Sequence, residues 1–306
     1  MQHVRPVPRS GRLYGGAVVL IGLLALVLSL ATASAAQNVS AGDAMLLGIE
    51  LGMGRAVDSE IVYVVGPPTT LPPAHKAWVE AIFRDMVAQT RRRDIRYLLR
   101  VLDSEMVNAF SAPGGFIYLT TGLLEHLGNH GDALANVIGH ELAHVELRHA
   151  LHQLLRSVEV GLWVSLGAGL SEQSEAWRRV EEVGMETVLL GWSRQQELEA
   201  DALGQRMAAA AGYDPMGLVA FFDMVELVEK LLEPELADIL THPSVPERKQ
   251  RARVLAAQLP VAERKRPEPA PPAELPDLSS IIERLERELQ QREADPVFAE
   301  PSGARP

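Results

Sequence analysis

Two histidines four residues apart, His140 and His144, carry the clearest chemical signal in this chain of 306 residues. Glu141 follows the first of them, in the run HELAHVELRH at residues 140–149. On an α-helix a step of four residues turns about 400°, so both imidazoles face the same side, about 40° apart. This arrangement suits one zinc ion, and Glu141 is placed to accept a proton from water beside the ion. The pattern therefore predicts a zinc-dependent hydrolase that cleaves peptide bonds.

A catalytic zinc ion takes three protein ligands and keeps one position open, so a third ligand must come from elsewhere in the chain. The segment SRQQELEADALG, residues 193–204, offers Glu197 and Asp201 on one face of a predicted helix. Glu197 is the predicted third ligand, and Asp201 is predicted to accept a hydrogen bond from a ligand histidine and orient its ring. Glu199 points about 200° away from Glu197 and is not expected to join it. Gly204 would let this helix pack closely against its neighbour.

His149 lies near the motif, but helix geometry argues against it as a ligand. The helix that carries the motif is predicted to run without a break from about residue 132 to residue 156. On such a helix His149 lies about 180° round from His140, on the apolar side. We therefore expect a buried histidine that is hydrogen-bonded within the fold. Leu147 and Ala150 stand where metzincins carry Gly and His, which excludes that ligand pattern.

The remaining pattern predicts a mainly α-helical protein with a small β-sheet, an α+β fold. Helical periodicity marks residues 41–60, 75–90, 132–156, 174–190, 194–211, 215–232 and 245–258, and strand-like runs cover 97–102, 106–110 and 116–120. The run Phe116–Leu119 is predicted to form an edge strand beside the cleft, where an extended substrate would pair with its backbone. An interior strand fits the same residues equally well.

Composition and charge exclude several classes of protein. With 47% hydrophobic and 23% charged residues, the chain has the balance of an ordinary folded protein. Its net charge is -11 and it has no basic tract, which argues against nucleic acid as a partner. The chain has no cysteine, so a Cys-ligated metal, a disulfide framework and a thiol nucleophile are excluded.

The first 35 residues have the pattern of a signal peptide. Arg5, Arg9 and Arg12 precede an apolar stretch from about Gly16 to Leu30, and Ala33-Ser34-Ala35 offers a cleavage site. An uncleaved anchor, which would associate the protein with a membrane, is the alternative. Either way, residues 36–259 are predicted to form a zinc metallopeptidase domain outside the cytoplasm. Residues 260–306 are predicted to form a proline-rich linker, a helix and a disordered tail.

Several segments resemble the HtpX and CAAX-prenyl-protease family of zinc metallopeptidases. They are HELAH with His149, Ser193-Arg194 before Glu197-Leu198-Glu199-Ala200-Asp201, NAFSAPGGFIYLTTGLL at residues 108–124 and THPSVPER at residues 241–248. The last two are similar to the soluble periplasmic BepA and LoiP branch, and the similarity covers about residues 42–258. The resemblance implies a zincin-like fold, one zinc ion per subunit bound by His140, His144 and Glu197, and Glu141 as the base. The helical-repeat extension of BepA-type proteins is not matched, because a proline-rich tail follows residue 260.

His242 is a second candidate catalytic residue, in the loop before the last predicted helix of the metallopeptidase domain. It could stabilise the oxyanion that forms when the scissile carbonyl is attacked. Alternatively, it could occupy the fourth zinc position in a resting state and block water, which would make the site self-inhibited.

Together these features predict a zinc endopeptidase that cleaves unfolded or misassembled proteins of the cell envelope, in periplasmic quality control. The envelope role depends on the resemblance alone. One alternative is a zinc-containing chaperone or adaptor that binds such proteins with little turnover. The other is a structural protein of the envelope in which zinc only staples the fold and His242 completes the ligand shell.

Overall fold

The computed structural model describes residues 41–157, 175–231, 245–263, 275–277 and 280–287. The chain divides into two compact units, Met1–Ile49 and Glu50–Pro306. In the first unit only residues 41–49 are described, as the start of helix α2 (Ala41–Val64). The predicted signal or anchor at residues 1–35 lies outside the described residues. Among the helices that are described, none has both the length and the apolar character needed to cross a membrane.

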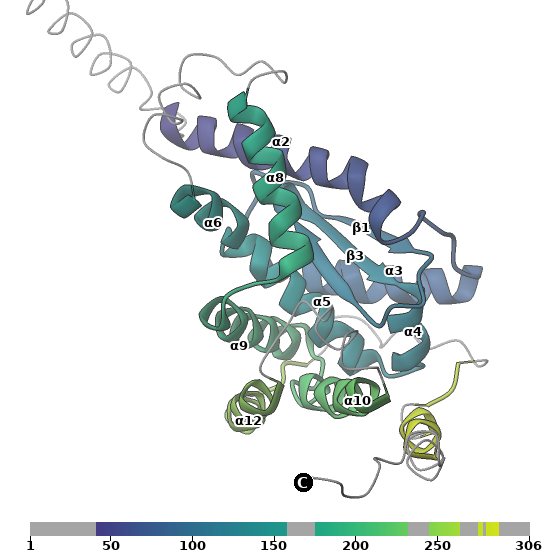
Figure 1. Ribbon diagram of the computed structural model, residues 1–306. Coiled ribbons are helices and arrows are strands. Elements are labelled where there is room, and N and C mark those ends of the chain that lie inside the picture. Colours follow the sequence, from purple (N-terminus) through teal and green to yellow (C-terminus); the bar gives the residue numbers. More distant parts are fainter. Residues whose placement is uncertain (1–40, 158–174, 232–244, 264–274, 278–279, 288–306) are drawn as a thin grey trace, which may run out of the picture. The chain divides into compact units, whose positions relative to one another are not determined.

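The second unit is mainly helical, which confirms the predicted fold class (Figure 1). Besides the rest of α2, its described helices are α3 (Pro73–Val87), α4 (Thr121–Leu127), α5 (Gly131–Glu146), α6 (His149–Ser157), α8 (Glu175–Leu190), α9 (Arg194–Ala211), α10 (Gly217–Leu231) and α12 (Val245–Ala256). Residues 280–287, from the predicted C-terminal helix, are also helical. In α9, Ser193 and Gln196 form a capping box at the start, and Gly212 ends the helix with a φ of 91°. Local sequence signals therefore set both ends of the helix that carries Glu197.

A three-stranded sheet contains β1 (Leu98–Leu102), β2 (Ala109–Ala112) and β3 (Phe116–Thr120). The strand order is β1-β3-β2, with β1 parallel and β2 antiparallel to β3. Since β3 is paired on both sides, the prediction that Phe116–Leu119 forms an edge strand is wrong. The reason is that β3 pairs with β1 on one side and with β2 on the other, where Gly114 and Gly115 adopt φ angles of 78° and 102° and fold β3 back onto β2. The strand that contacts α5 at an edge of the described sheet is β2.

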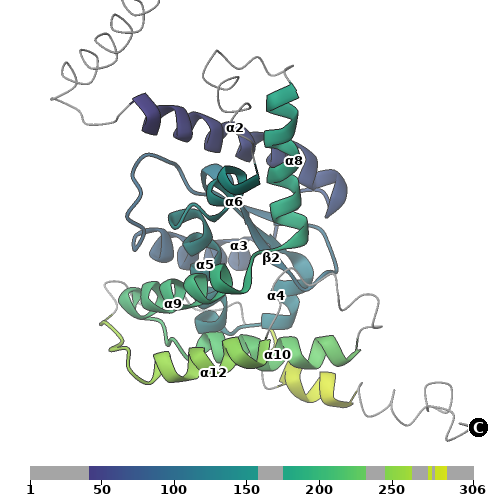
Figure 2. The same ribbon diagram turned by 60° about the vertical axis from the view of Figure 1, so that its left-hand side comes forward.

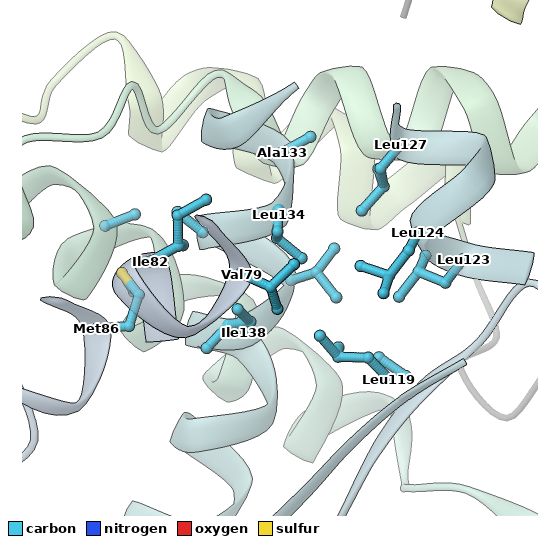
Figure 3. Packing of buried hydrophobic residues seen from close by; sticks show 14 of the residues in the cluster. Val79, Ile82, Met86, Leu119, Leu123, Leu124, Leu127, Ala133, Leu134 and Ile138 are labelled. Carbon is cyan, nitrogen blue, oxygen red and sulfur yellow. The ribbon is translucent and has the colours of Figure 1, made fainter. Parts of the chain in front are cut away.

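Helix α5 is held by a hydrophobic core, part of which Figure 3 shows. Its Leu134 and Ile138 are fully buried. Their cluster includes Val79, Ile82 and Met86 from α3, Leu119 from β3, and Leu123, Leu124 and Leu127 from α4. Burying each such side chain contributes about 1.5–3 kcal/mol, so the cluster fixes α5 in place. Ile138 precedes His140 by two residues, about 200° of helix, so this packing turns His140 towards the opposite side.

The motif helix is shorter than predicted. Helix α5 ends at Glu146 and α6 begins at His149, so the prediction of one continuous helix over residues 132–156 is wrong. Between the two helices Arg148 adopts a φ of 50°, in the left-handed region that residues other than glycine seldom occupy. Such a backbone costs about 1–3 kcal/mol and persists only where surrounding contacts hold it.

A cluster of four charged side chains holds this break. Arg148 lies 3.1 Å from Asp94 and 3.9 Å from Glu50, measured between guanidinium nitrogens and carboxylate oxygens. Arg92 bridges the same two acids, at 2.8 Å from Asp94 and 2.5 Å from Glu50. Arg92 also donates a hydrogen bond to the carbonyl of Val145, in the last turn of α5. These contacts tie α2 and the segment before β1 to the end of the motif helix, and they offset the strain at Arg148.

Candidate metal centre

Helices α5 and α9 touch through two glycines, and Figure 2 shows α9 lying alongside α5. A Cβ atom on Gly204 would lie 2.6 Å from the backbone nitrogen of His140. A Cβ atom on Gly139 would lie 2.9 Å from the carbonyl oxygen of Gly204. Both distances are too short for a side chain, so the predicted close packing at Gly204 is confirmed. This contact brings the first turn of α9, which carries Glu197, to the histidines of α5.

The structure brings the three predicted ligands together. The Nε2 atoms of His140 and His144 are 3.0 Å apart. The Glu197 carboxylate oxygens lie 3.6 Å from Nε2 of His140 and 3.5 Å from Nε2 of His144. All three side chains are buried, and among the described residues they form the group that could hold a metal ion. The two helices thus present two imidazole nitrogens and one carboxylate to a common point.

The donor set fits zinc. Zinc binds histidine nitrogen and carboxylate oxygen at about 2.0–2.2 Å, and a tetrahedral arrangement places such ligand atoms about 3.3 Å apart. The two imidazole nitrogens are 3.0 Å apart, and each lies at a similar distance from one oxygen of Glu197: 3.6 Å to Oε2 for His140 and 3.5 Å to Oε1 for His144. Among the described residues three side chains offer ligand atoms, and a catalytic zinc site needs three protein ligands and an open fourth position.

Asp201 lies beside His140, as its spacing from Glu197 predicts. Its carboxylate oxygen is 2.8 Å from Nδ1 of His140, the ring atom that faces away from the ligand cluster. A hydrogen bond from Nδ1 to this carboxylate would keep the lone pair on Nε2 and orient the ring toward a metal ion. Burial opposes the charge of Asp201, but Arg248 and His140 outweigh it and lower its pKa to about 2. Asp201 is therefore ionised at neutral pH and can only accept hydrogen bonds.

Arg248, on α12, is a site residue that the sequence analysis did not single out. Its guanidinium makes two hydrogen bonds of 2.7 Å to Asp201 and lies 2.6 Å from an oxygen of Glu197. Burial opposes its charge, but Asp201, Glu197 and Glu141 raise its pKa, so it stays protonated. Its guanidinium carbon also lies 5.0 Å above the ring centroid of Phe222. Arg248 thus compensates the negative charge of the site. The available sequence signal was its place at the end of THPSVPER.

His144 is packed between two further rings. Trp192 stacks on it with a centroid distance of 4.4 Å, and Nδ1 of His149 lies 2.9 Å from its Nδ1. Burial lowers the pKa of His149 to about 4, although Glu199 acts in the opposite direction, so His149 is neutral at neutral pH. The prediction that His149 is buried and hydrogen-bonded within the fold is confirmed. The sequence did not predict that its partner would be His144, a histidine of the motif. No spacing pattern indicates that Trp192 stacks on His144.

The structure describes one of the two predicted catalytic residues, Glu141, but not the other, His242. Glu141 is buried on α5, next to His140, and it is close enough to Arg248 to raise the pKa of that side chain. His242 lies outside the described residues, in the stretch before α12. Its predicted place beside the site therefore stays a prediction.

The fold and the site define a zincin-like metallopeptidase, with a motif helix, a second helix that supplies a glutamate, and a small mixed sheet. Residues 73–256, more than half of the chain, match the model of peptidase family M48. The chain belongs to this family and is a metalloendopeptidase by class. Members of the family generally depend on zinc, which agrees with the donor set described above.

The chain is similar to curated metalloproteases of bacteria and mitochondria. It is 30% identical over 200 residues to the mitochondrial metalloendopeptidase OMA1 of Schizosaccharomyces pombe, covering 65% of this chain and 56% of that protein. Over 170 residues it is 33% identical to the Arabidopsis thaliana protein of the same name, covering 55% of this chain and 33% of the relative. Over 241 residues it is 26% identical to the beta-barrel assembly-enhancing protease of Escherichia coli, covering 73% of this chain and 47% of the relative. The chain thus spans between about a third and just over half of these relatives.

Proposed function

We propose that this protein is a zinc-dependent endopeptidase that cleaves unfolded or misassembled proteins of the cell envelope. One zinc ion per subunit would be held by His140, His144 and Glu197. The observation that carries the proposal is the spacing of these three buried donors, 3.0 to 3.6 Å, which fits a tetrahedral ion. The catalytic unit in this proposal is residues 36–259, which contain the segment that matches the family.

The chemistry can be assigned to the chain's own residues. A zinc ion bound here would supply Lewis acidity towards water and the scissile carbonyl. Glu141 accepts the proton of the attacking water and delivers a proton to the leaving amine. Asp201 holds His140 in one tautomer, and Arg248 holds Asp201 and Glu197 in place. The surrounding burial excludes bulk water and strengthens each of these electrostatic contacts.

An extended substrate would pair with β2 rather than β3, because β3 is paired on both sides; since all four residues of β2 are buried, this pairing requires the groups that cover its edge to move aside. In the antiparallel ladder the backbone groups of Ala109 and Ser111 point away from β3, since Asn108 is hydrogen-bonded to Thr120 and the bonding alternates along the strand. Ser111 also lines a small pocket together with His144 and Trp192, which places this edge beside the candidate metal centre. Backbone pairing of this kind selects extended chains rather than one sequence, which supports unfolded proteins as substrates.

Periplasmic quality control in the cell envelope is the physiological setting that we propose. Two observations support it: the export-like pattern of residues 1–35 and the similarity to proteins named beta-barrel assembly-enhancing protease. If the N-terminal segment is retained, it would tether the enzyme to a membrane. Proteins named as mitochondrial metalloendopeptidases are also similar to this chain, so the similarity by itself does not determine the compartment.

The purified protein should bind one zinc ion per chain and cleave unfolded casein only when zinc is present. Replacing His140 with Ala should weaken zinc binding by more than the 10–100-fold that loss of an outer partner typically costs. His152, an exposed histidine on α6, provides the matched control, and His152→Ala should bind zinc like the wild type. The measurements are metal content, zinc titration against a chelator, and casein cleavage. Zinc binding without cleavage would favour the chaperone or staple alternatives, and absence of zinc binding would refute the proposed site.

His242 is proposed to assist the reaction from outside the ligand set. If it stabilises the oxyanion, His242→Ala should lower kcat about 10²–10³-fold while zinc content stays the same. If it blocks the fourth zinc position in a resting state, the same change should raise activity. Steady-state kinetics and metal content separate these results. Unchanged activity together with unchanged zinc content would remove His242 from the mechanism.

A further inference from the structure

A chain of hydrogen-bonding groups leads from His144 to the protein surface. Nδ1 of His144 lies 2.9 Å from Nδ1 of His149, and Nε2 of His149 lies 3.3 Å from a carboxylate oxygen of Glu199. The other carboxylate oxygen of Glu199 accepts a hydrogen bond of 2.7 Å from the amide of Gln195. His149 is buried, whereas the side chain of Glu199 is 46% exposed. The chain thus connects a proposed zinc ligand to a carboxylate at the surface.

The break after α5 creates this contact. On an uninterrupted helix, five residues turn about 500°, which would place His149 about 140° round from His144. With Arg148 in the left-handed conformation, the two ring centroids are instead 5.0 Å apart. The amide of Gln196 also donates to the backbone carbonyl of His149, which ties the start of α6 to α9. The left-handed backbone at Arg148 thus brings His149 against His144 at the site.

For a neutral His149, the contacts with Glu199 and His144 allow one placement of protons along this chain. A carboxylate can only accept hydrogen bonds, so Glu199 favours a proton on Nε2 of His149. A neutral imidazole then has its lone pair on Nδ1, which must accept from Nδ1 of His144. That places a proton of His144 on Nδ1 and leaves Nε2, the atom that faces His140 and Glu197, as the ring nitrogen available to a metal ion. The opposite placement would direct a lone pair of His149 at a carboxylate.

We infer that His149 and Glu199 are positioning residues that set the tautomer and ring orientation of His144. His140 is oriented directly by Asp201, and His144 is oriented through His149 by Glu199. Each imidazole of the motif is therefore linked to a different carboxylate of α9: His140 directly to Asp201, and His144 through His149 to Glu199. The consequence for zinc affinity depends on the proposed zinc site, whereas the proton placement does not.

The proton placement can be measured without a variant of the ligands. Spectra of ¹⁵N-labelled imidazoles distinguish a protonated ring nitrogen from a bare one, and comparison with His149→Phe assigns the His149 signals. We expect the wild-type protein, zinc-free and zinc-loaded, to carry the His149 proton on Nε2 and the His144 proton on Nδ1. A His149 proton on Nδ1 in both forms would overturn the inference, whatever the protein does with zinc.

Zinc affinity supplies a second readout that is independent of activity. His149→Phe keeps a ring of similar shape but removes the acceptor facing His144, and it should weaken zinc binding about 10–100-fold. Glu199→Gln keeps the shape of an exposed side chain, replaces an obligate acceptor by an amide, and should weaken binding by a smaller factor. His152→Ala, on the same helix as His149, should bind zinc like the wild type.

The outcomes separate this inference from the proposed function. A wild-type protein that binds no zinc would refute the proposed function, while the ring spectra would still decide the proton placement. A wild type that binds zinc, with folded His149→Phe and Glu199→Gln proteins of equal affinity, would overturn the positioning role and leave the zinc site intact. If His149→Phe fails to fold, Glu199→Gln decides, because an exposed carboxylate can be replaced without emptying the core.

Discussion

Replacing Glu141 with Gln should abolish most peptidase activity while leaving zinc binding unchanged. A positioned general base contributes about 10²–10⁴-fold to rate, so kcat/KM should fall by that factor, or roughly 3–5 kcal/mol in the barrier. Gln has nearly the same size and cannot accept the proton, and Glu141 is not among the three donors at the metal centre. Casein cleavage, zinc affinity and the free energy of unfolding should be measured on both proteins.

The control for this change is Glu125→Gln, an exposed glutamate on α4, which should retain full activity. Equal cleavage by wild type and Glu141→Gln would exclude Glu141 as the base. The result also separates the enzyme from its alternatives. A chaperone or a zinc-stapled structural protein would bind zinc with either residue and would show no cleavage that depends on Glu141.

Removing the charge of Arg248 should cause the largest loss of stability. Arg248→Met keeps an apolar side chain of similar length beside Phe222, but it leaves the carboxylates of Glu197 and Asp201 without their cation. Removing one partner of a buried ion pair typically costs about 3–5 kcal/mol, because a buried charge remains uncompensated. We expect that loss in the free energy of unfolding of the zinc-free protein, measured in urea.

Zinc should reduce the cost of this change, since a cation at Glu197 would replace part of the missing positive charge. The loss for Arg248→Met should therefore be smaller in the zinc-loaded protein than in the zinc-free one. The matched control is Arg251→Met on the same helix, where Arg251 is 64% exposed and pairs with Glu247. Exposed pairs of this kind contribute about 0.2–1 kcal/mol, so the control should change little. Equal losses for the two variants would contradict the role given to Arg248.

Several parts of the site follow from local sequence. The four-residue steps of His140 to His144 and of Glu197 to Asp201 place each pair on one helix face, because the α-helix has a fixed period. Gly204 indicated the close approach of the second helix, which its contact with the His140 backbone confirms. Helical periodicity made the mainly helical fold class predictable. Capping signals also set the ends of α9.

Other parts were decided by tertiary structure. The break at Arg148 depends on charges supplied by Glu50 and Asp94, more than 50 residues away, and no local signal marks it. Arg248 reaches Glu197 from α12, although 51 residues separate them in the sequence. The interior place of β3 likewise depends on its parallel pairing with β1, which the turn that joins β2 to β3 does not determine.

One physical cause separates what the local sequence determined from what the tertiary structure decided. Helix period and capping are properties of residues within a few positions of each other, so the sequence by itself determined which side chains share a face: His140 with His144, and Glu197 with Asp201. Ion pairing, ring stacking and strand order depend on which distant segments pack together. Only the tertiary structure therefore decided that Arg248 balances the charge of the site, and that a helix break brings His149 against His144.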